Sequence, residues 1–446
     1  MRLLRPSLGM ALRRAFLLLG LSCVLPAQAQ TLKSSWSSQW QEQTVNLQQG
    51  PLAQAARLAP ALLQAAGPAR SDSRQQAHEL TLRHERSDLP GQSQLLVAAT
   101  GRLTRQYGNR TQDESWQARV QLQEAALSAS HENWSWTAGR KVLSWDVGWG
   151  FRPNDMVQQE RRRGLLPSTL RGQALLMLEH FDADQAWSLV AVNPQRLGEA
   201  VSAAEPAQAL DREAALALRW YRRHGSQDVY AYARLGRGER ASLGLATQTV
   251  MGNSLSLYAS LRWRQRHAAW ESVLGDPAGL RWQPAWQHDA VQALLGAQWT
   301  PEGSAHSWIL EAWHDGTASS DADWQRWQGM LDTLSGAPGA QPPQRRAQMA
   351  LQQLAPLQRG SGSLQRRNLL LRWSWQTGEL REWQLSADLL HHPADGGHSL
   401  GLGLQWQGQR WQLGGAWRRL AGGPAALLAN MPQRGSLGLW AQADFL

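Results

Sequence analysis

Three clusters of histidine and aspartate contain the side chains whose chemistry is most readily catalytic. They are His180 with Asp182 and Asp184, His314 with Asp315, and the group of His391, His392, Asp395 and His398. A histidine beside a carboxylate can take a proton from water, so each cluster could serve a hydrolase. Imidazole nitrogens are also common ligands of transition metals, so the third cluster could hold an ion.

The sequence around these clusters favours turns over catalysis or metal binding. Asp395 lies in the run Pro-Ala-Asp-Gly-Gly, a composition typical of tight chain reversals. The three histidines of its cluster lack a fixed helical spacing, and no pattern of a Ser-His-acid lipid hydrolase is visible. We therefore expect no catalytic residue, no bound metal and no cofactor, and we keep a hydrolase only as a lesser alternative.

The cationic side chains are almost all arginine. The chain carries 45 Lys and Arg against 35 Asp and Glu, a formal net charge of +10, and its lysines are Lys33 and Lys141. Guanidinium groups stay charged near neutral pH and offer paired donors to carboxylate, sulfate or phosphate oxygens. Whether they act together depends on the elements that carry them.

A period of two in the apolar residues runs through most of the sequence after residue 76. Between 254 and 264, Leu, Ala and Trp alternate with Ser, Tyr and Arg, and similar runs occur near 369–376, 382–389 and 400–406. Such alternation predicts β-strands with one apolar and one polar face. Beyond the first 25 residues, no stretch approaches the ~18–20 apolar residues of a membrane-spanning helix.

A transmembrane barrel explains these strands better than a soluble sandwich. The strands are about 10–13 residues long, near the ~9–11 that a tilted membrane strand needs and above the ~5–6 of soluble sheets. The chain has 25 Trp against 5 Tyr and 4 Phe, and several Trp stand at strand ends, where an indole can lie at a membrane surface.

Loop lengths support the barrel independently. If a last strand over 434–446 ends in the periplasm, every long connection falls on the external side, near 146–170, 194–211, 266–287 and 315–364. Seventeen strands follow from residue 76, and because such barrels usually have an even number, we expect one more near 36–48. The sequence thus predicts an all-β, antiparallel up-and-down transmembrane barrel of about 18 strands, with 16 as the alternative, and helical segments in long external loops.

The N-terminus is typical of an exported protein. Residues 1–29 combine a basic start, an apolar run and the small-residue site Ala-Gln-Ala, so we expect a signal peptide cleaved before Gln30. The single cysteine, Cys23, leaves with it, which excludes thiolate chemistry from the mature chain. We assign 30–75 to an N-terminal segment with a possible first strand and a helical or loop region, and 76–446 to the barrel. Nucleic acid is not an expected partner of an exported chain.

The C-terminal strand carries a recognisable signal. Leu437, Leu439, Ala441, Ala443 and Phe445 occupy alternate positions. This resembles the closing strand of outer-membrane barrels, which ends in an aromatic residue read by the barrel-assembly machinery. Here Phe445 stands one residue before the end, which departs from that pattern. The resemblance implies the cell outer membrane as the location, with that machinery, membrane lipid and lipopolysaccharide as partners.

A second resemblance lies between 139 and 155. Its residues are Gly139, Arg140, Trp145, Gly148, Gly150, Pro153 and Asp155. The stretch is similar to an early strand and loop of alginate-export-like and related porin-like barrels of Gram-negative bacteria, although Asp146 stands where Gly is commoner. Gly148 and Gly150 permit a tight exit from the strand. The segment either bends into the lumen or forms a loop anchored by Trp149 and Phe151.

The connection over 315–364 is long enough to have a function of its own. Trp324, Trp327, Leu331 and Leu334 recur at helical spacing. We expect this connection to fold inward as a constriction or plug, with an external cap as the alternative.

Six arginines lie on the polar faces of their strands and would line the lumen: Arg119, Arg219, Arg262, Arg264, Arg372 and Arg418. An electropositive lumen favours anionic solutes, such as small organic acids or uronate-bearing saccharides. The alternative is that these arginines pair with inward acids and brace the barrel. We therefore predict a porin-like channel that passes or exports small or polymeric anionic solutes, with a non-conducting structural or adhesive barrel as the competing hypothesis.

Overall fold

The computed structural model describes residues 30–45, 73–90, 92–107, 116–158, 162–167, 170–197, 199, 212–273, 281–326, 329, 363–377, 382–424, 426–431 and 433–445. The predicted signal peptide over 1–29 lies outside these residues, and so does the part of the N-terminal segment, 46–72, that would hold the expected helical or loop region.

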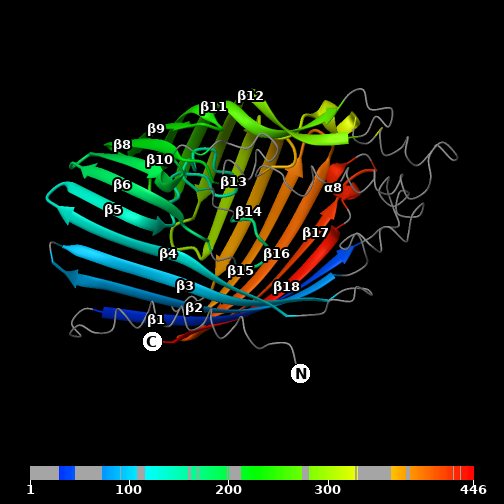
Figure 1. Cartoon of the computed structure of the whole chain (residues 1–446). Helices are drawn as coiled ribbons and strands as arrows, with labels where there is room; N and C mark the ends of the chain where they lie inside the picture. The colour runs from blue at the N-terminus through cyan, green and yellow to red at the C-terminus, as the bar shows by residue number, and fades with distance from the viewer. Residues whose placement is uncertain are drawn as a thin grey trace.

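Eighteen antiparallel strands form one closed sheet (Figure 1). The strands are β1 (Gln30–Val45), β2 (Ser73–Leu89), β3 (Ser93–Tyr107), β4 (Gln117–His131), β5 (Trp134–Lys141), β6 (Gln173–Phe181), β7 (Gln185–Val192), β8 (Ala215–His224), β9 (Gln227–Gly236), β10 (Arg240–Met251), β11 (Leu255–Val273), β12 (Arg281–Trp299), β13 (His306–Asp315), β14 (Arg367–Gln376), β15 (Trp383–His392), β16 (Gly397–Gln407), β17 (Trp411–Ala421) and β18 (Gln433–Phe445). Each pairs with its neighbours in sequence, and β1 pairs with β18. The sheet therefore has no free edge.

Short helices complete the described structure. They are the 3-10 helix η1 (Pro194–Arg196), α8 (Leu427–Asn430) and a helical turn over 321–326. Among the described helices, none is long and apolar enough to cross a membrane.

The expected strand count and the strand expected near 36–48 are confirmed. That strand is β1, which starts earlier, at Gln30, and pairs with the C-terminal strand from Ser34 opposite Phe445. The prediction of a loop over 266–287 was wrong in its bounds. The loop is shorter, because β11 and β12 remain paired as far as Val273 and Arg281. Cross-strand hydrogen bonding continues there through a mixed polar and apolar sequence that looked like a loop.

The two faces of the sheet differ as the alternation predicted. Leu257, Leu371 and Leu404 are exposed on the outer face, and Leu385 pairs directly with Leu404. An apolar outer face is what a barrel surrounded by lipid requires. The apolar core lies inside the barrel, where Trp145, Met156 and Phe151 of the β5–β6 connection pack against the inner wall.

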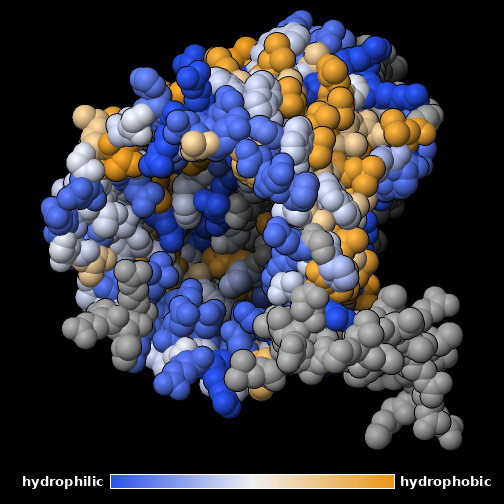
Figure 2. All heavy atoms as spheres, turned by 90° about the vertical axis from the view of Figure 1, so that its left-hand side faces the viewer, coloured by the Kyte–Doolittle hydropathy of each residue, from blue (hydrophilic) through white to orange (hydrophobic). Residues whose placement is uncertain are grey.

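All the connections at one end of the barrel are short, whereas the long connections lie at the other end, with α8 (Figure 1). Figure 2 looks into the end opposite α8 and shows a hollow mouth surrounded largely by hydrophilic residues. In outer-membrane barrels the short turns face the periplasm. We refer to the end with the short turns as the periplasmic end on this basis.

Candidate functional site: a constriction inside the barrel

The described residues of the connection between β5 and β6, 142–158, 162–167 and 170–172, enter the barrel instead of forming an external loop. We call these residues the constriction segment. Asp155 organises its first turn: Oδ1 accepts the backbone N–H groups of Trp145 at 2.8 Å and Asp146 at 3.1 Å, and Oδ2 pairs with Arg152 Nε at 2.8 Å. Because one buried carboxylate satisfies three donors, this non-repetitive backbone can be buried.

Asp146 closes the same turn and attaches it to the wall. Its Oδ2 accepts the backbone N–H of Asn154 at 2.6 Å, its Oδ1 accepts that of Val147 at 2.8 Å, and the Ser260 hydroxyl of β11 donates to Oδ1 at 2.8 Å. Burial raises the pKa of the Asp146 carboxyl to about 6, although these hydrogen bonds act in the opposite direction. Asp146 stands where glycine is commoner in the barrels that this stretch resembles. Its carboxyl is therefore a structural anchor of the segment.

Polar groups of the wall hold the tip of the constriction segment. Asn154 is fully buried, and its Nδ2 donates to Ser260 Oγ at 2.8 Å and to the carbonyl oxygens of Leu245 and Leu261 at 3.2 Å each. Arg262 Nη1 donates to the Pro153 carbonyl oxygen at 2.7 Å. These contacts join the segment to β10 and β11.

Glu311 of β13 provides a second anchor. Its side chain is fully buried, and it accepts the backbone N–H groups of Trp149 at 2.6 Å and Gly150 at 2.7 Å, as well as the Tyr258 hydroxyl at 2.7 Å. Gly150 cannot be replaced without movement here, since a Cβ would lie 2.5 Å from Leu370 Cδ2 and 2.9 Å from Glu311 Oε2. The glycine of the sequence motif thus permits close approach to the wall.

The constriction segment then crosses to the opposite wall. Arg418 Nη1 of β17 donates to the Arg163 carbonyl oxygen at 2.8 Å, and Gln39 Nε2 of β1 donates to the Pro167 carbonyl oxygen at 2.9 Å. Because the segment leaves from β5 and touches β1, β13 and β17, it spans the lumen and narrows it.

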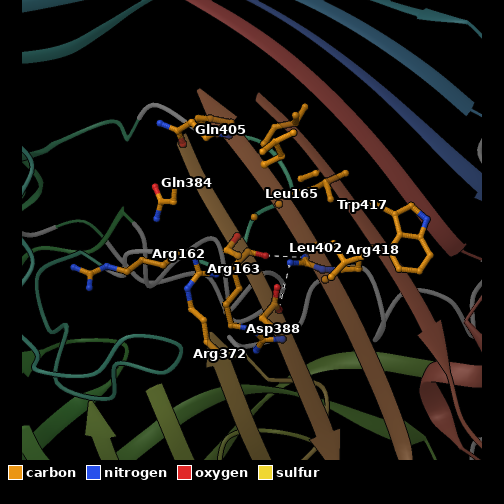
Figure 3. Close-up of a pocket in the computed structure, with 18 of the residues that line it drawn as sticks. Arg162, Arg163, Leu165, Arg372, Gln384, Asp388, Leu402, Gln405, Trp417 and Arg418 are labelled. Carbon is orange, nitrogen blue, oxygen red and sulfur yellow. Dashed lines mark hydrogen bonds and ion pairs between the residues drawn. The ribbon is translucent and has the colours of Figure 1, made fainter. Parts of the chain in front are cut away.

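A cavity of about 220 Å³ lies between this segment and the wall formed by β14 to β18. Arg162, Arg163, Arg372 and Arg418 line it, and among its described lining residues Asp388 is the one carboxylate. Figure 3 shows the side chains of Arg163, Arg372 and Arg418 gathered around Asp388, with Arg162 extending away from them. The arginines come from both the segment and the wall, so the positive charge faces the cavity from two sides.

Few of the described interactions neutralise the guanidiniums of Arg163, Arg372 and Arg418. Arg418 Nη2 lies 3.9 Å from Asp388 Oδ1, and the Arg372 guanidinium stacks 4.4 Å from the centre of the Trp149 ring. The buried Nε atoms of Arg163 and Arg418 have no hydrogen-bond partner. Burial, followed by repulsion from Arg418, lowers the pKa of Arg163 to about 10, so it remains charged near neutral pH. The cavity has an excess of positive charge.

A second cavity of about 220 Å³ lies on the other side of Leu165, Leu166 and Pro167, against β1 to β3. Gln39, Gln41 and Gln75 line it together with Arg102, whose Nη1 pairs with Glu79 at 3.2 Å. This side of the lumen is therefore close to neutral.

The six arginines expected to line the pore do not share one role. Arg372 and Arg418 line the first cavity. Arg219 lies over the Tyr230 ring, and Arg119 is exposed opposite Arg102. Arg262 and Arg264 instead pair with Glu239, at 2.6 Å and 2.7 Å, and Arg262 is 4% exposed. These two brace the barrel, which is the alternative that the sequence left open.

Glu239 is the centre of this brace. Burial would raise the pKa of its carboxyl, but the guanidiniums of Arg262, Arg264 and Arg234 together lower it below its usual range. Arg234 also pairs with Glu213 at 3.0 Å. The cluster is a buried network of paired charges, so it adds little field to the lumen.

The clusters of histidine and aspartate have structural surroundings. Asp315 Oδ1 accepts from Gln292 and from the backbone and hydroxyl of Thr317, and Asp395 accepts the backbone N–H groups of Gly397 and Leu427. In the described part of the chain, no three His, Cys, Asp or Glu side chains are placed to hold a metal ion. Turn formation explains both aspartates.

Several residues of the constriction were not found from the sequence. Arg162 and Arg163 come from the connecting segment, where alternation does not predict orientation. Glu311 and Glu239 are single acids whose partners are distant in sequence. The one local signal for Glu311 was its place as an acid at an inward position within the apolar run from 308 to 313. Of the connection over 315–364, the structure describes residues 315–326, 329 and 363–364. The inward fold expected for this connection lies mostly outside the described residues and stays a prediction.

Solved structures with the same architecture come from Gram-negative bacteria. The chain superposes on Acinetobacter baumannii OccAB1 with a TM-score of 0.54 and 10% identity, covering 93% of this chain and 96% of that one. For A. baumannii OccAB3 the TM-score is 0.52 at 10% identity, with 93% and 99% covered. For Pseudomonas aeruginosa OccK8 (OprE) it is 0.51 at 10% identity, with 93% and 98% covered.

No family model and no curated protein matches the sequence. The identity to these structures is too low to carry over their solutes, so the similarity concerns architecture. The chain has the closed 18-strand fold of the Occ outer-membrane porins of Gram-negative bacteria.

Proposed function

We propose that this chain is an outer-membrane channel through which small anionic solutes diffuse, and that the constriction segment sets its selectivity. The observation that carries the proposal is the composition of the first cavity. Four arginines, Arg162, Arg163, Arg372 and Arg418, face a space in which Asp388 is the one described lining carboxylate. Fixed positive charge at a narrow point attracts anions and repels cations.

The constriction limits the size of the solute. The segment crosses the lumen between Glu311 and Arg418 and leaves cavities of about 220 Å³ on either side. These dimensions suit small organic acids or short uronate saccharides better than an extended polymer. Outer-membrane location, signal-peptide cleavage and insertion by the barrel-assembly machinery through β18 are parts of the same proposal, supported by the fold and by the alternation that ends at Phe445.

Reversal potentials across planar bilayers with a salt gradient test this function. The wild-type channel is expected to prefer chloride over potassium, and the double variant Arg372→Gln with Arg418→Gln should lose much of that preference. Arg74→Gln is the matched control, because Arg74 of β2 pairs with Glu42 and lines neither cavity.

Three outcomes would contradict the proposal. A cation-selective wild-type channel would show that the arginines do not set the field at the constriction. Equal selectivity of the wild type and the double variant would assign selectivity to other residues. A correctly folded protein that gives no current would favour the non-conducting structural barrel.

A further inference from the structure

A cleft opens on the outer surface of the barrel at its periplasmic end. It has a volume of about 210 Å³ and is lined by Trp134 of β5, Leu178 and His180 of β6, and Trp187 and Leu189 of β7. All these residues belong to described strands, and the cleft is separate from the cavities in the lumen. Nothing in the proposed channel function uses it.

Strand register explains the shape of the cleft. Trp134, His180 and Trp187 are direct cross-strand neighbours, so two large indoles flank a smaller imidazole in one row. In the next row towards the membrane centre, Leu178 is opposite Leu189. The indoles form walls and the leucines form a floor. Trp134 and His180 lie with ring centroids 4.6 Å apart, which fixes one wall.

The lining is apolar and accessible. Trp134 is 50% exposed, and Leu178, Trp187 and Leu189 are exposed on the same face. At this end of an outer-membrane barrel, aromatic side chains lie at the level of the lipid headgroups, and the row below them faces acyl chains. A groove with an aromatic rim and a leucine floor therefore fits a hydrocarbon chain that enters from the inner leaflet.

Charges of both signs lie just beyond the aromatic row. Asp182, in the turn after β6, is exposed and accepts a hydrogen bond from Gln185 Nε2 at 2.8 Å. Arg222 of β8 is the cross-strand neighbour of Gln185 and is exposed two residues beyond Trp220, whose ring lies tilted beside Trp187. An acid and a cation thus stand on the two sides of one glutamine.

We propose that this cleft binds one phospholipid of the inner leaflet with a zwitterionic aminoethyl-phosphate headgroup. One acyl chain lies between Trp134 and Trp187 over Leu178 and Leu189. The phosphate faces Arg222, and the ammonium group faces Asp182. A lipid with a purely anionic headgroup lacks the cation that would pair with the carboxylate, so this pair of charges selects against it.

Native mass spectrometry of the whole folded protein tests the site, with an equimolar mixture of phosphatidylethanolamine and phosphatidylglycerol supplied in detergent. Wild type should retain one phosphatidylethanolamine. Trp187→Ala removes a wall and should weaken retention about tenfold, a loss typical of one large apolar contact. Leu178→Trp fills the cleft and should have the same effect without removing apolar surface. Trp308→Ala is the matched control, since Trp308 is an exposed indole at the same end, on β13, outside the cleft.

The headgroup is tested separately. The double variant Asp182→Asn with Arg222→Gln should retain both lipids equally, while its heat-modifiable migration on gels shows that the barrel is folded. Absence of retained lipid on the wild type, or equal retention by wild type and both cleft variants, would overturn the site. Preference of the wild type for phosphatidylglycerol would overturn the assignment of the headgroup. None of these results bears on ion selectivity, so failure here is distinguishable from failure of the proposed channel function.

Discussion

Removing the carboxylate of Glu311 should release the constriction segment from β13. Glu311 is fully buried and accepts three hydrogen bonds of 2.6 to 2.7 Å, from two backbone N–H groups of the segment and from the Tyr258 hydroxyl. In Glu311→Gln the new amide group directs N–H towards one of these donors, so at least one hydrogen bond is lost. In Glu311→Ala all three donors lose their acceptor.

The magnitude follows from this count. A hydrogen bond to a charged group contributes about 1.5–3 kcal/mol, and a buried donor left without a partner costs about 1–3 kcal/mol. With three donors left at about 1–3 kcal/mol each, Glu311→Ala should weaken attachment by roughly 3–9 kcal/mol. Glu311→Gln should weaken it by about 2–3 kcal/mol and Tyr258→Phe by about 1.5 kcal/mol. The segment remains attached through Asn154 and Arg262 on one wall and through Arg418 on the other. We thus expect partial release around Trp149 and Gly150.

Single-channel recording measures this release directly. Open-channel noise and mean conductance should rise in the order wild type, Tyr258→Phe, Glu311→Gln, Glu311→Ala. Hydrogen exchange at residues 149 and 150 should accelerate in the same order. If correctly folded Glu311→Ala channels matched the wild type in conductance, noise and exchange, Glu311 would not anchor the segment and the reasoning would be refuted.

Two further predictions concern the barrel wall and the dependence on pH. An arginine placed on the outer face, at Leu257, Leu371, Leu385 or Leu404, should cost about 2–4 kcal/mol at the membrane midplane and block assembly. Normal yields of heat-modifiable protein from these variants would contradict the strand register. Burial raises the pKa of Asp146 to about 6, above its ordinary value, so ionisation is disfavoured in the docked segment. The stability that Asp146 contributes is fully present below its unfolded pKa and is lost as pH rises through about 6. Channel noise should therefore fall between about pH 7 and pH 5 in the wild type and change less in Asp146→Asn; equal responses would exclude Asp146 as the titrating group.

The strands could be predicted because their signal is local. Each residue of a strand faces either lipid or the interior, so alternation of Leu371 with Arg372, or of Leu404 with Gln405, reports the environment of that residue without reference to distant contacts. The turns are equally local, which is why the chain reversal at Asp395 was recognised. The exact ends of β11 and β12 were missed, because pairing with a neighbour extends strands through sequence that has no alternation.

The interior was decided by contacts that join distant residues. The sequence contained the motif from Gly139 to Asp155 but left open whether it bends inward; Asn154 with Ser260, and Glu311 with Trp149, settle that question across more than 100 residues of chain. Alternation likewise placed both Arg262 and Arg372 on the inner face. Only the three-dimensional position of Glu239 and Pro153 shows that Arg262 braces the wall, whereas Arg372 faces the cavity.

The sequence by itself therefore determined the class of fold, a strand count of 18 or 16 and the side of the wall on which the residues of the alternating strands lie, because these follow from contact with lipid or water at each position. The tertiary structure decided which segment enters the lumen and which arginines line the cavity beside it. That choice depends on the desolvation and pairing of charges brought together from β1, β13, β17 and the constriction segment. No local pattern encodes such an arrangement.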